Sequence, residues 1–255
     1  MNEQGMLEVR MLGRFQVVRP DRTEVGPSEW RTGKTADVLR LLALRPGLPV
    51  STRSLAERVW PQVDDRRALA SLRTAAYQIR RAIGFNCIDR RFGTITLPTA
   101  WTDVVVYQRL GGAVRDACSA GNLERAVELV EQSERLYVGD FSAHDDTSDW
   151  AVDLRESLAS LRGLVLADGA SSAVRLRRPR QAISFALRAI ERDPCAEAPH
   201  RSLLEGYAQL GEVDRALRAY EHCRSTLARE LGADPSPSTQ ALHLRVLRGE
   251  VGPTV

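Results

Sequence analysis

The stretch ALASLRTAAYQIRRAIG, residues 68–84, decides how the first hundred residues fold. It follows a polar segment, residues 62–67, that we predict to be a loop, and it ends in Gly84, a residue typical of helix termini. Its apolar residues are spaced as on one face of an α-helix. They are Leu69, Leu72, Ala76, Ile79 and Ile83. We therefore predict a helix that buries this face in the core.

The opposite side of the predicted helix is polar and basic. It carries Arg67, Ser71, Thr74, Gln78 and Arg81, and its flanks carry Arg73, Tyr77 and Arg80. A solvent-exposed helix normally mixes glutamate with arginine, because opposite charges one turn apart attract each other, but residues 68–84 contain no acid. Small side chains let a helix approach the major groove, where Gln, Thr and Arg can bond bases or phosphates. The pattern favours DNA binding over a merely solvated face.

Two shorter amphipathic helices are predicted before this one, in residues 35–44 and 51–60. Hydroxyl side chains favour the first position of a helix, because they accept a bond from a backbone N–H that has no partner inside the helix. We therefore predict that Thr35 caps or opens the first helix, and that Ser51 or Thr52 caps the second.

Segments that alternate apolar and polar residues flank the three helices. Residues 7–19 predict strands with a break at Gly13, and residues 87–97 predict a hairpin whose turn begins at Arg91. Strands, three helices and a hairpin in this order define a winged helix-turn-helix of the response-regulator output type. Arg90 and Arg91 would lie at the tip of the hairpin, or wing, close to phosphates or the minor groove; a basic turn without a partner is the alternative.

The charge of the chain is divided unevenly between its two halves, although the 255 residues carry a formal net charge of only +3. Residues 1–102 contain 17 basic and 10 acidic residues, a net charge of +7, whereas residues 103–255 contain 19 and 23, a net charge of −4. We therefore predict two domains with these bounds and with different partners.

The sequence shows no signal for a membrane or for export. It contains no run of about 18 apolar residues, and its first ten residues lack the apolar segment of a signal peptide. Its four cysteines are far apart and form no C-x-x-C pair, which predicts neither disulfides nor a metal site. They are Cys87, Cys118, Cys195 and Cys223. We predict a cytoplasmic protein without cofactor or metal.

One stretch, WRTGKTADVL at residues 30–39, is similar to the end of a phosphate-binding loop. Such a loop needs a glycine five positions before its Gly-Lys pair, but Ser28 stands at that distance from Gly33. No nucleophile–base pair and no cluster of carboxylates indicates catalysis elsewhere. We therefore predict that Lys34 does not bind ATP and that the protein is not an enzyme.

The second half carries a helical repeat. Ala182 and Ala216 lie 34 residues apart, which is the tetratricopeptide period. The last repeat places large, small and turn residues as expected, at Leu203, Tyr207, Gly211, Ala216, Tyr220 and Cys223. A helix pair of this kind cannot bury its own apolar face, so the core forms by stacking. We predict a mostly α chain in which residues 103–255 form an all-α, protein-binding solenoid.

An insertion, GDFSAHDDTSDW at residues 139–150, interrupts the repeats. Phe141 and Trp150 are too apolar to remain in solvent, so we predict that both pack against neighbouring helices. Ser148 or Asp149 is predicted to cap the helix that follows.

Three groups of residues resemble one protein family. They are LRLLALRPGLPVSTRSLAERVW at residues 39–60, YVGDF with the later DW at 137–150, and AIERDPCAEAPHRSLLEGYAQLGEVDRALRAYEHCRSTLARELGADPSPST at 189–239. With these motifs the chain resembles the small form of the Streptomyces antibiotic regulatory proteins, from about Leu7 to Leu247. The resemblance implies a winged-helix domain followed by a bacterial transcriptional activation domain. Tyr77 and Gln78 stand where the family often has an arginine-rich pair, so the resemblance does not give the preferred operator sequence.

The resemblance implies an activator of an antibiotic or other secondary-metabolite gene cluster. Such proteins bind direct repeats near the −35 region, as a dimer or tandem pair on DNA, and recruit RNA polymerase holoenzyme through contacts with its principal sigma factor. The residues by themselves predict a protein-binding solenoid and a site for double-stranded DNA. The predicted DNA contacts are Arg67, Ser71, Thr74, Tyr77, Gln78, Arg80, Arg81, Arg90 and Arg91. The alternative is a protein-interaction scaffold whose winged helix binds no DNA, which would need a third helix with balanced charges.

Overall fold

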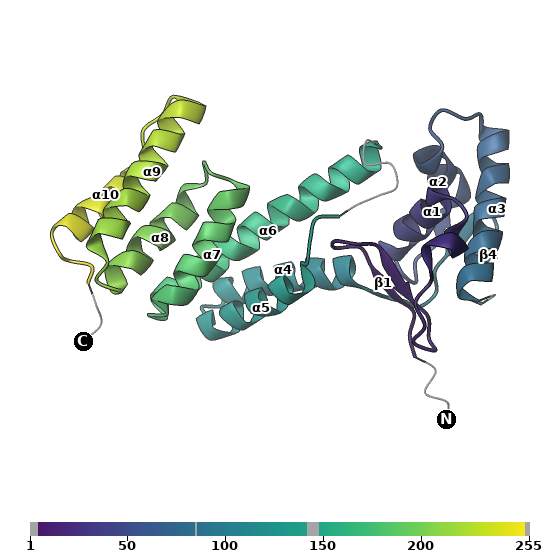
Figure 1. Cartoon of the computed structure of the whole chain (residues 1–255), viewed down its shortest axis with the longest axis horizontal. Coiled ribbons are helices and arrows are strands. Elements are labelled where there is room, and N and C mark those ends of the chain that lie inside the picture. The colour runs from purple at the N-terminus through teal and green to yellow at the C-terminus, as the bar shows by residue number, and fades with distance from the viewer. Residues whose placement is uncertain (1–4, 85, 142–147, 253–255) are drawn as a thin grey trace. The chain divides into compact units, whose positions relative to one another are not determined.

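The computed structural model describes residues 5–84, 86–141 and 148–252. The chain divides into two compact units, labelled by their elements in Figure 1: unit 1 is Met1–Gln108 with Leu136–Leu158, and unit 2 is Arg109–Arg135 with Ala159–Val255. This division differs from a single boundary after residue 102, because the chain returns to unit 1 after it has begun unit 2. Helices α4 (Asp103–Ser119) and α6 (Asp149–Arg175) each contribute residues to both units.

Unit 1 begins with a three-stranded sheet in the order β2-β1-β6. Its strands are β1 (Glu8–Arg10), β2 (Gln16–Val18) and β6 (Trp101–Thr102). β1 pairs antiparallel with β2 and parallel with β6. The predicted strands in residues 7–19 are confirmed, and so is their break at Gly13, whose φ of +93° suits glycine. Val9 and Met11 are fully buried, which explains the alternating pattern.

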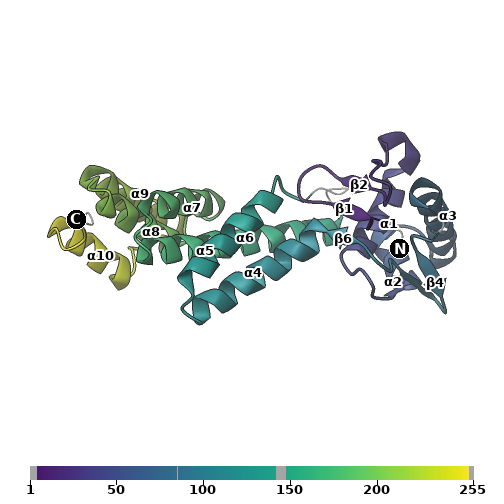
Figure 2. The ribbon, with the colours of Figure 1, turned by 90° about the horizontal axis from the view of Figure 1, so that it is seen from below.

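Three helices follow, and they lie against one another in both Figure 1 and Figure 2. They are α1 (Gly33–Ala43), α2 (Thr52–Val59) and α3 (Asp65–Ile83). The cap of α1 is Thr32 and not Thr35, because the Thr32 side chain accepts from the Thr35 backbone N–H while Thr35 is buried inside the helix. Of the two candidates for α2, Ser51 is the cap.

Helix α3 begins earlier than predicted. Asp64 caps it and Asp65 is its first residue, so the end of the predicted loop at residues 62–67 is helical. Two carboxylates at a helix N-terminus are favourable, because the helix dipole is positive there. The acid-free character of residues 68–84 therefore does not extend to the first turn of α3.

The buried face of α3 also lies to one side of the predicted stripe. The buried residues are Ala68, Leu72, Ala75, Ala76, Ile79 and Ala82, whereas Leu69 and Ile83 are only half-buried. The face is rich in alanine because α1 and α2 pack against it, and small side chains let helix backbones approach closely.

The wing predicted in residues 87–97 is confirmed. Its strands β4 (Asp89–Arg91) and β5 (Thr94–Thr96) are antiparallel, and the turn between them has positive φ at Phe92 and Gly93. A third strand, β3 (Val50–Ser51), pairs with the other edge of β5. It is too short to give an alternating pattern, so it was not predicted. The backbone N–H and the hydroxyl of Thr52 both donate to the Gly93 carbonyl, at 2.9 and 3.0 Å, which fixes the wing to the start of α2.

Unit 2 is an all-α, tetratricopeptide-like solenoid, as predicted. Besides parts of α4 and α6 it contains α5 (Leu123–Leu136, except its last residue), α7 (Pro179–Arg192), α8 (Glu197–Gln209), α9 (Val213–Leu231) and α10 (Pro237–Leu247). Successive helices lie side by side (Figure 2), and α8 packs against both α7 and α9. Ala182 and Ala216, which revealed the repeat, are both fully buried. In the described residues, no helix is long and apolar enough to cross a membrane.

A buried histidine makes the stability of unit 2 depend on pH. His200 lies in α8, with Nε2 2.9 Å from the carbonyl oxygen of Pro194. Burial lowers the pKa of His200 below its usual 6.5; His222 lowers it further, and the Pro194 bond and the charges of Glu197 and Asp193 oppose the shift. The folded state therefore favours the neutral ring. The resulting stability is complete above pH 6.5 and is lost as the pH falls through the folded pKa.

We expect the melting temperature of the full chain to fall between about pH 7 and pH 5, and to fall less in His200→Gln. The glutamine amide can keep donating to the Pro194 carbonyl but does not titrate. His222→Gln removes only the smaller contribution of the neighbouring ring, so it should weaken the pH dependence less than His200→Gln does. Identical pH dependence in the wild type and in His200→Gln, measured by calorimetry, would contradict this assignment.

Candidate DNA-binding surface

Helix α3 presents an exposed face along its whole length. The exposed residues after its first residue are Arg66, Arg67, Ala70, Arg73, Thr74, Tyr77 and Arg81. The inner face packs against α1, α2 and the short 3-10 helix η1 (Pro27–Trp30). Because three elements hold α3 from behind, its outer face is fixed in position.

The nine residues predicted to contact DNA fall into two groups in the structure. Arg67, Thr74, Tyr77, Arg81, Arg90 and Arg91 are exposed, and Ser71, Gln78 and Arg80 are half-buried. Arg73 and Tyr77, which were expected on the flanks, are therefore both exposed, and Tyr77 lies near the centre of the exposed face. Gln78 was expected at the centre but lies at the edge beside α1, where Thr35 donates a hydrogen bond to it at 2.6 Å. This shift follows from the rotation of the buried face.

Arg80 differs most from its expected position. Its Nη2 donates to the carbonyl oxygen of Ile88 at 3.1 Å, just before β4. The guanidinium group therefore connects the end of α3 to the base of the wing. Whether Arg80 or any of the other eight contacts DNA stays a prediction.

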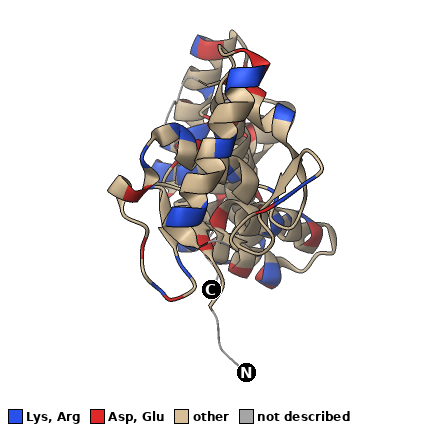
Figure 3. Cartoon of the chain, turned by 90° about the vertical axis from the view of Figure 1, so that its right-hand side faces the viewer, with Lys and Arg blue, Asp and Glu red and all other residues tan. Residues whose placement is uncertain are grey.

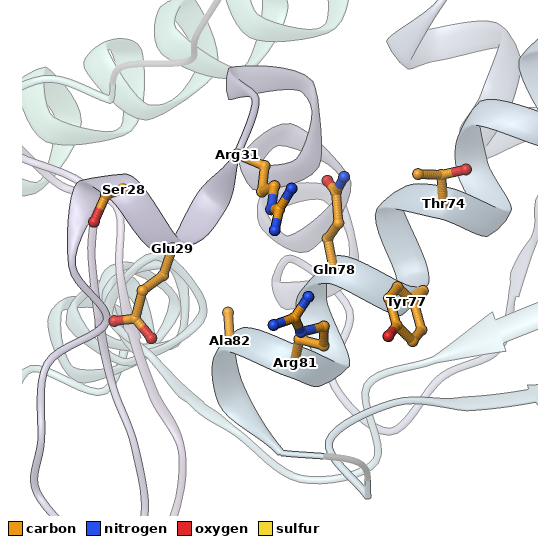
Figure 4. A pocket seen from close by; sticks show the side chains of 8 residues that line it. All are labelled: Ser28, Glu29, Arg31, Thr74, Tyr77, Gln78, Arg81 and Ala82. Carbon is orange, nitrogen blue, oxygen red and sulfur yellow. The ribbon is translucent and has the colours of Figure 1, made fainter.

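A depression of about 360 Å³ lies beside the C-terminal half of α3 (Figure 4). It is lined by Ser28, Glu29, Arg31, Thr74, Tyr77, Gln78, Arg81 and Ala82. Figure 4 shows Arg31, Gln78 and Arg81 around the same opening. Arg31 is exposed and has a φ of +59°, a conformation that arginine rarely adopts. The sequence did not indicate Arg31 as a site residue, because only the packing of η1 on α3 brings it to the opening.

The tip of the wing is exposed. Arg90 and Arg91 both lie in solvent, and Nη2 of Arg91 is 3.8 Å from a carboxylate oxygen of Asp89. Phe92 is fully exposed at the turn, with a φ of +45°. An apolar ring held in solvent at the end of a hairpin suits contact with the sugars or base steps of a minor groove. Sequence reasoning missed Phe92 as a site residue, although it stands between Arg91 and a turn glycine.

The charge of this surface is positive. Figure 3 faces the side on which α3 lies, and basic segments recur along that helix. Within the described part of the chain, the guanidinium groups of Arg31, Arg73 and Arg81 form no ion pair. Burial raises the pKa of Cys87 to about 11, against the lowering effect of the Arg80 charge, so this thiol is neutral at pH 7. The surface can therefore attract phosphates without opposition from a thiolate.

The stretch that is similar to a phosphate-binding loop has a different structure here. A 3-10 helix, Pro27–Trp30, precedes it in place of a buried strand, and the backbone N–H of Thr35 already bonds to Thr32. Lys34 is half-buried in the first turn of α1. Among the described residues no three His, Cys, Asp or Glu side chains are grouped to hold a metal.

Comparison with known proteins connects this geometry to one family. The family model described as "Bacterial transcriptional activator domain" matches residues 102–247, more than half of the chain. Regulatory protein DnrI of Streptomyces peucetius is 27% identical over 261 residues, which cover 96% of this chain and 94% of DnrI. Regulatory protein AfsR of Streptomyces coelicolor is 27% identical over 248 residues, which cover 93% of this chain but 24% of AfsR.

A solved structure supports the fold. The structure of Mycobacterium tuberculosis EmbR in complex with a low affinity phosphopeptide superposes with a TM-score of 0.81. The two sequences are 23% identical, and the match covers 98% of this chain and 66% of EmbR. The winged helix and the solenoid therefore occur together in that protein in the same order.

A winged helix with an exposed basic helix, joined to an activator-type solenoid, defines the protein as a transcriptional regulator. Because the chain matches DnrI over nearly its full length, the family within this class of regulators can be stated. The chain belongs to the Streptomyces antibiotic regulatory protein family.

Proposed function

We propose that this regulator is a sequence-specific DNA-binding transcriptional activator. The observation that carries the proposal is the outer face of α3, where beyond the first turn small residues and arginines stand without acids, and the exposed wing follows. A helix of this composition fits the major groove, with Thr74 and Tyr77 near base edges and arginines near phosphates. Arg90 and Arg91 would then meet the phosphates along the neighbouring minor groove.

Unit 2 would supply the activating contact. The family and the full-length match to DnrI support recruitment of RNA polymerase holoenzyme, including its principal sigma factor. They also support direct repeats near the −35 region as the target, bound by a dimer or tandem pair, in an antibiotic or secondary-metabolite gene cluster. On this proposal the chain acts in the cytoplasm, where the chromosome lies, and performs no catalysis.

The competing function is that of a protein-interaction scaffold. This function requires that the basic face of α3 either binds another protein or is simply solvated. It also requires that the affinity of the chain for DNA is negligible. Its weakness is that Arg31, Arg73 and Arg81 would remain without an acidic partner among the residues that the structure describes. Binding that depends steeply on salt and on DNA sequence would exclude it.

The test uses the full chain and a genome-wide map of bound sites, followed by titration of the recovered duplex and a scrambled copy. We expect the recovered duplex to bind about a thousandfold more tightly. In a purified transcription reaction, the full chain should then raise transcription from that promoter. Equal binding of both duplexes at every salt concentration would refute sequence-specific recognition.

Arg91→Ala tests the role of the wing. We expect it to weaken binding to the specific and the scrambled duplex by the same factor, because a phosphate contact carries no base information. The slope of log K against log salt should fall by about one, since one fewer counterion is released. Arg192→Ala removes an exposed arginine from the end of α7 and serves as the matched control. A change in base preference in Arg91→Ala would place this residue on the bases instead.

A further inference from the structure

A tight turn at Arg31 lies between two residues that are each held in place. Trp30 is buried and packs against Phe15, with the ring centroids 5.5 Å apart. Thr32 caps α1 by accepting the backbone N–H of Thr35. The backbone N–H of Thr32 also donates to the carbonyl oxygen of Trp30, at an N···O distance of 2.6 Å, which makes Arg31 the central residue of a γ-turn. Arg31 alone therefore provides the change of direction between η1 and α1.

The backbone of this turn is strained. Arg31 has a φ of +59° and a ψ of −46°, close to the form of the γ-turn that is rare in proteins. Glycine would adopt a positive φ at no steric cost, because it has no Cβ. Strained backbone conformations are concentrated at functional sites, where the surrounding structure enforces them. The presence of arginine where glycine would be unstrained therefore indicates that the Arg31 side chain has a function.

The side chain of Arg31 lines the depression beside α3 together with that of Arg81 (Figure 4). Both residues are exposed, and neither forms an ion pair within the described part of the chain. The depression is also lined by one acid, Glu29, whose charge is already compensated. One of its carboxylate oxygens pairs with Arg19, and the other accepts the backbone N–H of Gly26 at 2.7 Å. Two guanidinium groups from different elements therefore line one opening without a counter-charge of their own.

We propose that Arg31 and Arg81 together bind one phosphate of the DNA backbone at the edge of the groove that α3 enters. This proposal rests on the proposed function, in which the outer face of α3 lies in the major groove. Phosphates border that groove, and a guanidinium group can bind a phosphate through two parallel hydrogen bonds. A phosphate held between η1 and α3 would fix the register of the recognition helix on the duplex, but it would read no base.

Arg31→Gly and Arg31→Ala separate the phosphate contact from the turn. Both changes remove the guanidinium group, so in the full chain both should weaken binding to the recovered and the scrambled duplex by the same factor, about tenfold. Only glycine also removes the Cβ, so Arg31→Gly should melt at a higher temperature than Arg31→Ala. Equal losses of affinity at different melting temperatures would show that affinity is not lost through unfolding. Equal melting temperatures would contradict the strain at Arg31.

A double variant tests whether the two arginines share one phosphate. Two guanidinium groups on one phosphate neutralise a single charge of the DNA. Arg31→Ala combined with Arg81→Ala should therefore lower the slope of log K against log salt by about one in total. A fall of about two would assign a separate phosphate to each arginine and would overturn the shared site.

Arg22→Gly is the matched control. Arg22 is likewise an exposed arginine of unit 1 with a positive φ, +71°, but its guanidinium group pairs with Glu8. This change removes the same charge and should leave the affinity for both duplexes within about twofold of the wild type. An equally small effect of Arg31→Gly would overturn the phosphate contact and leave DNA binding intact, whereas a wild-type chain that binds neither duplex would refute the proposed function. Saturable binding of inorganic phosphate without DNA, lost in Arg31→Gly, would assign the depression to a free anion instead.

Discussion

Replacement of Asp103 by alanine is expected to lower the free energy of unfolding of unit 1 by about 4 kcal/mol. Asp103 is the first residue of α4, and its buried carboxylate accepts from three backbone N–H groups. The donors are those of Met11 at 2.7 Å, Leu12 at 2.8 Å and Val104 at 2.8 Å. Bonds to a charged acceptor contribute more than neutral ones, and buried donors left without a partner add their desolvation cost.

The measurement is urea unfolding of the full chain, followed by tryptophan fluorescence. All four tryptophans lie in the residues assigned to unit 1, so this signal follows that unit alone. Asp153→Ala, at an exposed position of α6 within unit 1, is the control and should shift the free energy of unfolding by less than about 0.5 kcal/mol. A shift for Asp103→Ala as small as that of Asp153→Ala would show that the carboxylate is not needed to hold residues 11 and 12.

This contact bears on where the DNA-binding part of the chain ends. A fragment cut after residue 102 contains β6 but lacks Asp103, so the loop between β1 and β2 loses its anchor. It also lacks Phe141, which forms a β-bridge with Leu12. The predicted boundary lies where the charge and the repeat pattern of the sequence change. The compact unit is instead defined by contacts between residues far apart in the sequence, such as Asp103 with Leu12.

The order of elements in unit 1 could be predicted because each signal is local. Gly84 ends a helix, a turn glycine closes the wing, and alternation marks strands, whatever the rest of the chain does. The face of α3 could not be predicted as well. Hydrophobic periodicity predicts that large apolar residues such as Leu69 are buried. In the structure, α1 and α2 pack closely against α3, and small residues such as Ala75 are buried there instead.

The candidate site depended still more on tertiary contacts. The sequence identified the exposed arginines of α3, because a long helical stretch such as residues 68–83 without an acid is unusual, and those of the wing, because they stand at the predicted turn. It did not indicate Arg31, since nothing in the segment before α1 shows that η1 will pack beside α3. It also gave Gln78 a central position, whereas the structure holds this residue at the edge through Thr35. Pairwise side-chain bonds between distant segments leave no periodic trace in a sequence.

The insertion at residues 139–150 was predicted to be fixed by two aromatic residues, and the structure distinguishes them. Residues 142–147 lie outside the described residues. Phe141 is fully buried as predicted, whereas Trp150 is half-buried, with its ring 5.8 Å from that of Phe141 in an edge-to-face arrangement. The next helix starts at Asp149, and the carbonyl of Ser148 accepts from its first turn, so Ser148 occupies the cap position. The larger stabilising contribution therefore belongs to Phe141.

We expect Phe141→Ala to lower the free energy of unfolding of unit 1 by about 3–5 kcal/mol, the usual cost of removing a buried aromatic ring. The substitution would leave a cavity beside Leu12 and Trp150. The backbone at residue 141, whose carbonyl accepts from Nε of Arg155 at 3.0 Å, would then be held less firmly. Phe92→Ala is the matched control, because that ring is fully exposed on the same unit and its removal should cost less than about 0.5 kcal/mol. The same urea titration measures both variants. If Phe141→Ala unfolds at the wild-type midpoint, residues 136–141 do not belong to the cooperative core of unit 1, and the winged helix is stable without the segment that returns to it.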